Sequence, residues 1–314
     1  MNVRTVLGDV APDELGRVDY HEHLFQVTPL LPGDELDDEA ASRGEAAVLK
    51  ASGFDAMVDA TPIGLGRDPA GAVRISAATG LAVVATTGAH REAHYAPSHW
   101  LRSLGAEERA NLFVRDLLEG MPERDAPGST TPLTGARAGL LKAGIGYWSI
   151  SDFERTTLEG VALASLSTGA PIMVHLEFCT AAHEVLDLLT ASGIPETRVV
   201  LAHADRDPDA ALHLELAARG AWLGYDGMAR PRTRSDAELV ALTEAVVAGG
   251  GAGSILLGGD VARRTRYLSY GGMPGLGYLA TRYLPRLRAA LGPLVDDFTG
   301  ANPQRFLAWA APAS

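Results

Sequence analysis

The chain has 314 residues, of which 46% are hydrophobic and 21% charged, a mixture typical of globular proteins that excludes disordered and fibrous classes. Acidic residues number 39 and basic residues 27, and the net charge of -12 would repel nucleic acid and anionic membrane surfaces. Only two basic residues are lysines, Lys50 and Lys142, and the other 25 are arginines.

Short apolar runs alternate with helical patterns along the whole chain. We expect strands over 17–24, 55–60, 81–87, 138–143, 171–176, 198–203, 220–225 and 254–259. Helical patterns lie over 37–52, 156–169, 179–193 and 207–220, and a last helix is expected to begin with Asn302 as its N-cap and Pro303 as its first residue. The stretch 119–135 is expected to be an extended connection.

The strands favour one particular α/β architecture. They are apolar throughout, which indicates parallel strands buried on both faces. Eight βα units predict a (β/α)8 TIM barrel, and we expect residues 1–314 to form this single domain.

The cysteine content and the absence of long apolar segments in the sequence indicate the cellular compartment. Cys179 is the single cysteine and has no partner for a disulfide within the chain. The first residues carry no apolar signal-peptide segment, and no apolar run is long enough to span a bilayer. We therefore expect a soluble cytoplasmic protein.

Several predicted strands end in residues that bind metals. Active sites of such barrels lie at the carboxyl ends of the strands. Strand one ends in His21 and His23, which share a face because side chains alternate along a strand. Strands five, six and eight end in His175, His203 and Asp260. Each of these could alone be a surface histidine, a core histidine or a helix cap, but together they predict a divalent-metal site.

Lys142 lies inside the apolar fourth strand, where an unpaired ammonium would be costly. Burial would favour the neutral amine, which can react with carbon dioxide to form a carbamate able to bridge two metal ions. An arginine could not replace it, because arginine does not deprotonate in proteins. A second interpretation makes Lys142 the nucleophile of a Schiff-base aldolase, but that reaction has no use for four histidines.

The order of these strand-end histidines, the strand lysine and the final aspartate along the chain resembles that of the phosphotriesterase family in the amidohydrolase superfamily. The segments that carry the resemblance are 5–25, 168–177, 199–209 and 302–309. It implies that His21, His23 and Asp260 hold one metal ion and that His175 and His203 hold the other. Carboxylated Lys142 and a hydroxide would bridge the two ions.

The resemblance also implies a chemistry. The metal ions would be zinc by preference, with manganese, cobalt or iron as alternatives. The bridging hydroxide would attack the substrate, and Asp260 would pass its proton to the leaving oxygen. Relatives are often homodimers, so the resemblance implies a homodimer as well.

The metal ligands do not distinguish the family's substrates, whereas the loops after strands three, seven and eight should. The loops after strands seven and eight carry Arg230 and Arg232, then Arg263, Arg264, Arg266 and Tyr270. Arginines at the active face favour an anionic small molecule, and the leading hypothesis is a lactonase acting on a sugar or phosphorylated sugar lactone. The alternatives are a phosphotriesterase or amide hydrolase with the same metals, or loop arginines that only face solvent or pair with Asp226, Asp236 and Glu238.

Other polar residues lie near the expected mouth of the barrel. His90 is a candidate substrate contact after strand three, while the roles of His94 and His99 stay open. Asp205 is expected to orient one of the histidines. Cys179 and Met228 are expected to be packing residues.

Overall fold

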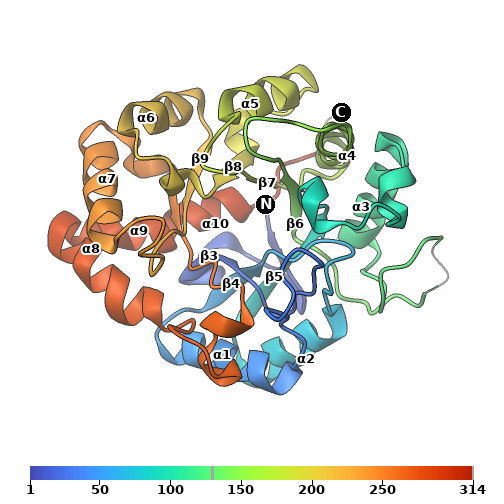
Figure 1. The fold of residues 1–314 in the computed structure, drawn as a ribbon, viewed down its shortest axis with the longest axis horizontal. Helices are drawn as coiled ribbons and strands as arrows, with labels where there is room; N and C mark the ends of the chain where they lie inside the picture. Colours follow the sequence, from blue (N-terminus) through green and yellow to red (C-terminus); the bar gives the residue numbers. More distant parts are fainter. Residues whose placement is uncertain (129–130, 313–314) are drawn as a thin grey trace.

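The fold is an eight-stranded parallel barrel wrapped by helices, described here from a computed structural model for residues 1–128 and 131–312 (Figure 1). The barrel strands are β3 (Val18–Glu22), β4 (Ala56–Asp59), β5 (Ala82–Gly88), β6 (Leu140–Gly144), β7 (Ile172–His175), β8 (Val199–Ala202), β9 (Trp222–Tyr225) and β10 (Ile255–Leu257). They pair in chain order, all parallel. The Asp260 amide donates to the His21 carbonyl at 2.8 Å, which joins the two end strands.

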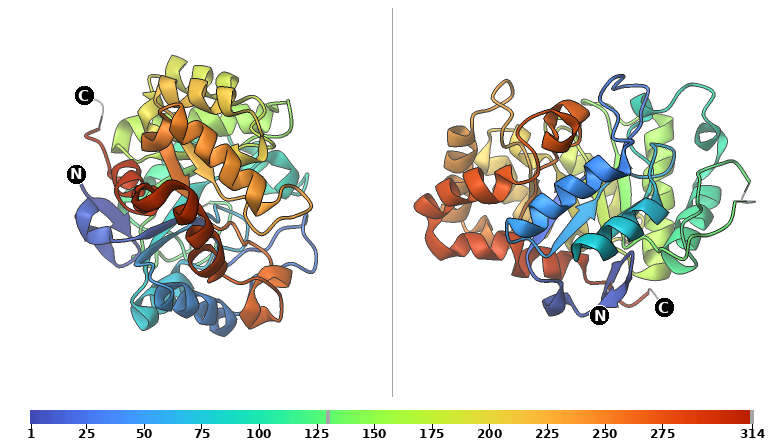
Figure 2. Two further views of the ribbon diagram at one scale, coloured as in Figure 1. Left: turned by 90° about the vertical axis from the view of Figure 1, so that its left-hand side faces the viewer. Right: turned by 90° about the horizontal axis from the view of Figure 1, so that it is seen from below.

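Helices form the outer layer. They are α1 (Glu39–Ala51), α2 (Pro69–Thr79), α3 (Ala106–Leu118), α4 (Asp152–Thr168), α5 (Ala182–Ala191), α6 (Ala210–Arg219), α7 (Asp236–Ala248), α8 (Leu284–Leu291), α9 (Val295–Thr299) and α10 (Ala301–Leu307). A hairpin of β1 (Val3–Thr5) and β2 (Gly8–Val10) lies at one end of the barrel (Figure 2). None of the helices in the described part of the chain is both long and apolar enough to cross a membrane.

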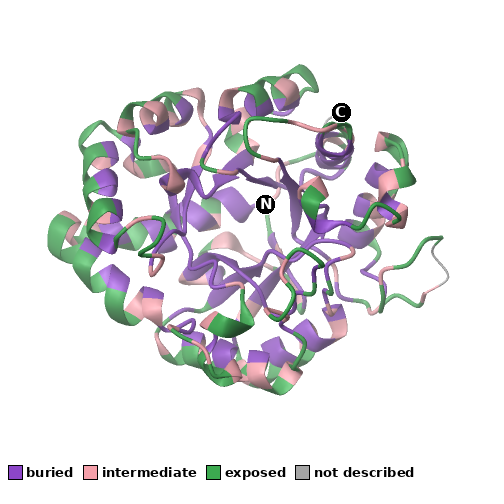
Figure 3. Cartoon of the chain, viewed as in Figure 1, coloured by how far each residue is buried: buried purple, intermediate pink, exposed green. Residues whose placement is uncertain are grey.

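Alternation along the strands divides the core into two layers. Val84, Leu140, Met173, Val200 and Leu256 pack together inside the barrel, while the residues between them face the helices. The helices accordingly show buried inner faces and exposed outer faces in Figure 3. The barrel is therefore a packed support that leaves only the strand ends for chemistry.

The predicted (β/α)8 barrel is confirmed, and each predicted strand matches a barrel strand closely. The four helical patterns correspond to α1, α4, α5 and α6. The predicted start of the last helix is wrong, because α10 begins at Ala301. Asn302 instead donates its side-chain amide to the carbonyls of Ala252 and Ile255. The connection expected over 119–135 folds back on itself through a bridge between Pro122 and Leu133, and residues 129 and 130 lie outside the described residues.

A buried ion network ties that connection to the barrel. The Arg67 guanidinium lies 2.7 Å from carboxylate oxygens of both Asp116 and Asp125. Asp125 also accepts from the Gly64 amide, and Asp116 accepts from the Thr87 hydroxyl. The Arg67 side chain is 4% exposed, so its charge depends on these partners.

We predict that Arg67→Met destabilises the fold by about 3 kcal/mol, because it leaves carboxylates buried without their shared cation. Urea unfolding followed by circular dichroism measures the loss. The matched control is Arg74→Met, since Arg74 pairs with Glu39 at the surface and is 56% exposed. Equal losses in the two variants would contradict the importance of the buried network.

Candidate metal centre

The polar residues at the strand ends converge on one cavity at the carboxyl end of the barrel. It is lined by His21, His23, Gln26, Leu30, Leu31, His90, Arg91, His94, His175, Glu177, His203, Arg206, Arg230, Asp260, Ala262 and Arg263. Five of the six residues expected to bind metals are among them, and the sixth, Lys142, lies 3.3 Å from His21. The strands thus bring all six together.

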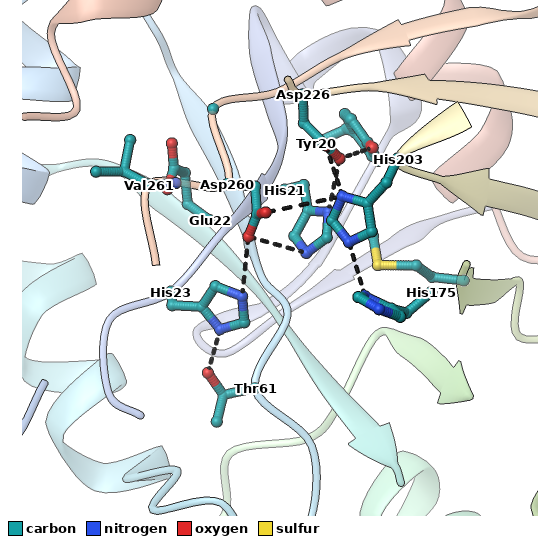
Figure 4. A network of polar contacts seen from close by, with 12 residues as sticks. Tyr20, His21, Glu22, His23, Thr61, His175, His203, Asp226, Asp260 and Val261 are labelled. Carbon is teal, nitrogen blue, oxygen red and sulfur yellow. Dashed lines mark hydrogen bonds and ion pairs between the residues drawn. The ribbon is translucent and has the colours of Figure 1, made fainter. Parts of the chain in front are cut away.

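An irregularity in β3 sets the direction of the first histidine pair. The pairing of β3 with β4 shifts register between Asp19 and Glu22, which interrupts the alternation of side chains. Consecutive residues Tyr20 and His21 can therefore both reach Asp226 inside the barrel, as Figure 4 shows. His23 continues toward the same cavity.

Asp226, at the end of β9, is the central acceptor of the site. It lies 2.6 Å from His203 Nδ1 and 3.1 Å from His21 Nδ1, and it also accepts from the Tyr20 hydroxyl. Burial raises the pKa of this carboxyl, but His203 and His21 outweigh burial and bring it well below its usual value. Because a carboxylate only accepts hydrogen bonds, both histidines carry their proton on Nδ1.

The expectation that Asp205 orients a histidine is therefore wrong, since Asp226 has that role. Asp205 accepts instead from the Gly227 amide at 2.7 Å. Asp226 could have been found by the rule that located the other residues, because it directly follows an apolar barrel strand.

The other two histidines are oriented in the same manner. His175 Nε2 lies 2.9 Å from the Glu177 carboxylate, which leaves Nδ1 free of a proton. His23 Nδ1 lies 2.6 Å from the Thr61 hydroxyl, so that Nε2 faces Asp260 at 3.6 Å. Burial, reinforced by Lys142, lowers the pKa of His21 to about 3, and burial also lowers the pKa of His175 and His203.

These tautomers leave unprotonated nitrogens facing one another. His175 Nδ1 and His203 Nε2 are only 2.8 Å apart, and the other ring nitrogen of each donates to a carboxylate. Two lone pairs at that distance repel unless a cation lies between or beside them. His21, His23 and Asp260 form a second group whose ligand atoms lie within 4.8 Å of one another. The donor set therefore fits metal ions.

Lys142 is fully buried in β6, as the sequence predicts. Its Nζ lies 3.3 Å from His21 Nε2 and 3.3 Å from Met173 Sδ. Burial lowers the pKa of Lys142 to about 8, although Asp260 and Asp226 oppose the shift. The amine is thus held among the candidate metal ligands in an environment that disfavours its ammonium form.

Asp260, three residues after the end of β10, has a left-handed backbone with φ of 41°. Strand β3 holds this turn: a carboxyl oxygen of Asp19 accepts from the Gly259 amide, and a carboxyl oxygen of Glu22 accepts from the Val261 amide. The Asp260 carboxylate lies 2.6 Å from Arg230. Burial raises its pKa, but Arg230, followed by His21, lowers it well below the usual value, so the group is an anion.

Only some of the predicted substrate-binding arginines of loops seven and eight line the cavity. Arg230 and Arg263 line the cavity, whereas Arg232 is exposed away from it. Arg264 pairs with Asp37 at 3.6 Å and lies over the Tyr270 ring. Tyr270 itself bonds to Asp38 and Ser42, and Arg266 donates to the Asp260 carbonyl from behind. Arg91 and Arg206, which sequence reasoning did not select, line the cavity as well.

The loop after β5 supplies two more cavity residues. Gly88 has φ of 116°, and its close approach to the Lys142 carbonyl leaves no room for a Cβ. The chain then turns so that the His90 ring packs at a tilt against His94, with ring centres 3.9 Å apart, and against His175 at 4.5 Å. His99 lies outside the cavity and accepts from the Leu101 amide. Cys179 and Met228 are buried in the core, as expected.

Comparisons with known proteins agree with this geometry. The chain is 31% identical to a phospho-furanose lactonase of Mycoplasmopsis agalactiae, over 99% of this chain and 92% of the relative. The crystal structure of the lactonase Lmo2620 from Listeria monocytogenes superposes with a TM-score of 0.91 at 29% identity, over 99% of this chain and 100% of that one. An amidohydrolase from Mycoplasma synoviae superposes with a TM-score of 0.93 at 30% identity, over 98% of this chain and 92% of that one.

A model of the phosphotriesterase family matches residues 1–307. The resemblance inferred from the strand-end residues is thereby confirmed over almost the whole chain. The protein belongs to the phosphotriesterase family.

Proposed function

We propose that this protein is a metal-dependent lactonase that opens an anionic sugar lactone, with a phosphorylated sugar lactone as the leading candidate. The observation that carries the proposal is the meeting of unprotonated histidine nitrogens and the Asp260 carboxylate beside cavity arginines. The names of the similar lactonases support the same bond type. A phosphotriester or amide could react at the same site, and a substrate panel distinguishes them.

The tautomers of His21, His175 and His203 support the metal-binding roles. His21, His23 and Asp260 would hold one divalent cation, and His175 with His203 the other, with carboxylated Lys142 between them. Nitrogen and carboxylate ligands suit zinc, and manganese, cobalt or iron are alternatives. When bound, such cations supply Lewis acidity toward the carbonyl oxygen and make hydroxide available at neutral pH.

The chain's own residues complete the reaction. Asp260 is an anion in the cavity and accepts the proton of the attacking water. It then donates that proton to the ring oxygen that leaves as the lactone opens. Arg263 and Arg206 lie on the cavity wall, where guanidinium groups bind phosphate or carboxylate in a bidentate manner.

We predict that Lys142→Ala loses bound metal and lactonase activity, and that short carboxylic acids partly restore both by occupying the place of the carbamate. Metal content by mass spectrometry and turnover are measured in parallel, and a carbamate signal is sought by NMR after exchange with ¹³C-bicarbonate. Lys50→Ala is the control, because Lys50 pairs with Asp55 at the surface. Full metal content and activity in Lys142→Ala would remove the carbamate from the account.

We predict that Arg263→Met lowers kcat/KM for a phosphorylated sugar lactone by about tenfold to a hundredfold, since hydrogen bonds to charged groups contribute about 1.5–3 kcal/mol. The loss for the unphosphorylated lactone should be much smaller. Arg264→Met is the control, because Arg264 lies in the same loop outside the cavity. Equal losses for both substrates would show that Arg263 does not bind the anion.

The same panel includes a phosphotriester and N-acyl amino acids. Turnover of one of these without turnover of any lactone would replace the proposed function. Borohydride trapping of a carbonyl substrate on Lys142 would instead support the aldolase alternative.

A further inference from the structure

The cavity has two chemically different walls. Arg206 follows β8 and Arg230 follows β9, so these cations lie on one side of the barrel. His90 and His94 follow β5, which is four strands from β9 and therefore faces it across the barrel axis. Their wall carries no charge beyond the Arg91–Glu177 pair at 3.2 Å among the lining residues that the structure describes.

Gln26 belongs to this second wall. Its backbone is fixed by paired hydrogen bonds with Leu36, and the neighbouring Thr28 hydroxyl lies 3.1 Å from His94 Nδ1. The Gln26 side chain lines the cavity and is 5% exposed, yet its Oε1 has no hydrogen-bond partner within the described ranges 1–128 and 131–312. Buried polar atoms are rarely left unpaired, so this one points to a ligand.

His90 presents a donor to the same space. Its Nδ1 accepts from the Arg91 amide at 2.8 Å, and a backbone amide can only donate. The ring proton is therefore on Nε2, which has no acceptor among the described residues although the ring lines the cavity. The ring is packed against the rings of His94 and His175, with ring centres 3.9 Å and 4.5 Å away, which restricts its rotation.

We propose that Gln26, His90 and His94 form a hydroxyl-binding wall that selects a polyhydroxylated lactone ring. This proposal rests on the proposed function and deepens it. A sugar hydroxyl both donates and accepts, so it satisfies an unpaired amide oxygen and an imidazole N–H together. The anionic group of the substrate faces the arginines, and the ring hydroxyls face this wall.

Such a wall discriminates against lactones that lack the hydroxyls. A site built to hydrogen-bond a hydroxyl rejects the analogue without it, because the buried polar groups are then left unpaired. A wall that only packs against His175 would bind both kinds of ring equally.

The test compares a five-carbon sugar lactone phosphate with its dideoxy analogue, which has the same ring and phosphate without the ring hydroxyls. Gln26→Leu and His94→Phe are the variants, since the first removes the amide and the second keeps the stacked ring. We expect kcat/KM for the hydroxylated substrate to fall at least tenfold more than kcat/KM for the dideoxy substrate, mainly through KM. His99→Phe is the control, and unchanged metal content excludes damage to the metal centre.

Equal losses on the two substrates, or no loss, would overturn the proposal. Calorimetric binding of the open-chain polyhydroxy acid phosphate and of its dideoxy form gives a second readout without turnover. If wild-type protein opens neither lactone but still prefers the polyhydroxy acid in a Gln26-dependent manner, the proposed function fails and the wall stands. If that preference is missing or independent of Gln26, the wall fails.

Discussion

The buried carboxylate of Asp226 is the interaction on which the site depends. It receives hydrogen bonds from His21 on β3 and from His203 after β8, and thereby fixes the tautomer of two histidines from distant parts of the chain. Tyr20 donates to the same carboxylate, which helps to keep it an anion in the barrel interior. Carboxylates that orient ligand histidines make those ligands more basic and hold their rings in place. Without Asp226, the proton of each imidazole would be free to move to Nε2, and that nitrogen would then no longer offer a lone pair to a metal ion.

Backbone irregularity at the strand ends serves the same purpose. In a regular strand, the side chains of Tyr20 and His21 would point to opposite faces and could not reach one carboxylate. The register shift in β3 allows both to do so. His203 has φ of 64° and Asp260 has φ of 41°, conformations that cost energy for residues with a Cβ. The carboxyl groups of Asp19 and Glu22 offset that cost at Asp260 by accepting hydrogen bonds from the amides of the residues on both sides of it. Both residues carry this cost at strand ends where their side chains face the cavity.

The sequence could predict the barrel and the convergence of six residues because both follow from periodicity. Lys142 and His175 lie in phase with the interior residues Leu140 and Met173, so alternation alone places them correctly. For His203 and Asp260, the prediction depended on their position at the end of an apolar strand and not on the alternation of side chains. The hydrogen-bond partners of the histidines were harder to predict. Asp226 and Thr61 follow other strands than the histidines they contact, and only packing shows which side chains meet. Glu177, by contrast, lies two residues after its partner His175. Asp205 lies two residues after His203 in the sequence, but its carboxyl group accepts from the Gly227 amide and contacts no histidine ring nitrogen among the described residues.

The loops show the same limit more clearly. Six basic or aromatic residues in loops seven and eight looked alike in sequence, yet only Arg230 and Arg263 line the cavity. Arg264 and Tyr270 bind α1 and its N-terminal flank instead, while Arg91 and Arg206 reach the cavity from other loops. Loop side chains have no periodicity that fixes their direction, so their partners emerge only in three dimensions. The resulting cavity has arginines on one side, and on the other side Gln26, His90 and His94 beside the Arg91–Glu177 ion pair, within a protein of net charge -12.

The central claim is that the histidines, Asp260 and a carboxylated Lys142 hold two divalent cations. A crystal structure of the zinc-loaded protein, with anomalous scattering measured at the zinc edge, tests it most directly. The account predicts one anomalous peak among His21, His23 and Asp260, a second at His175 and His203, and electron density for a carboxyl group extending from Lys142 between them. The absence of anomalous peaks at these residues, with Lys142 present as a plain amine, would contradict it.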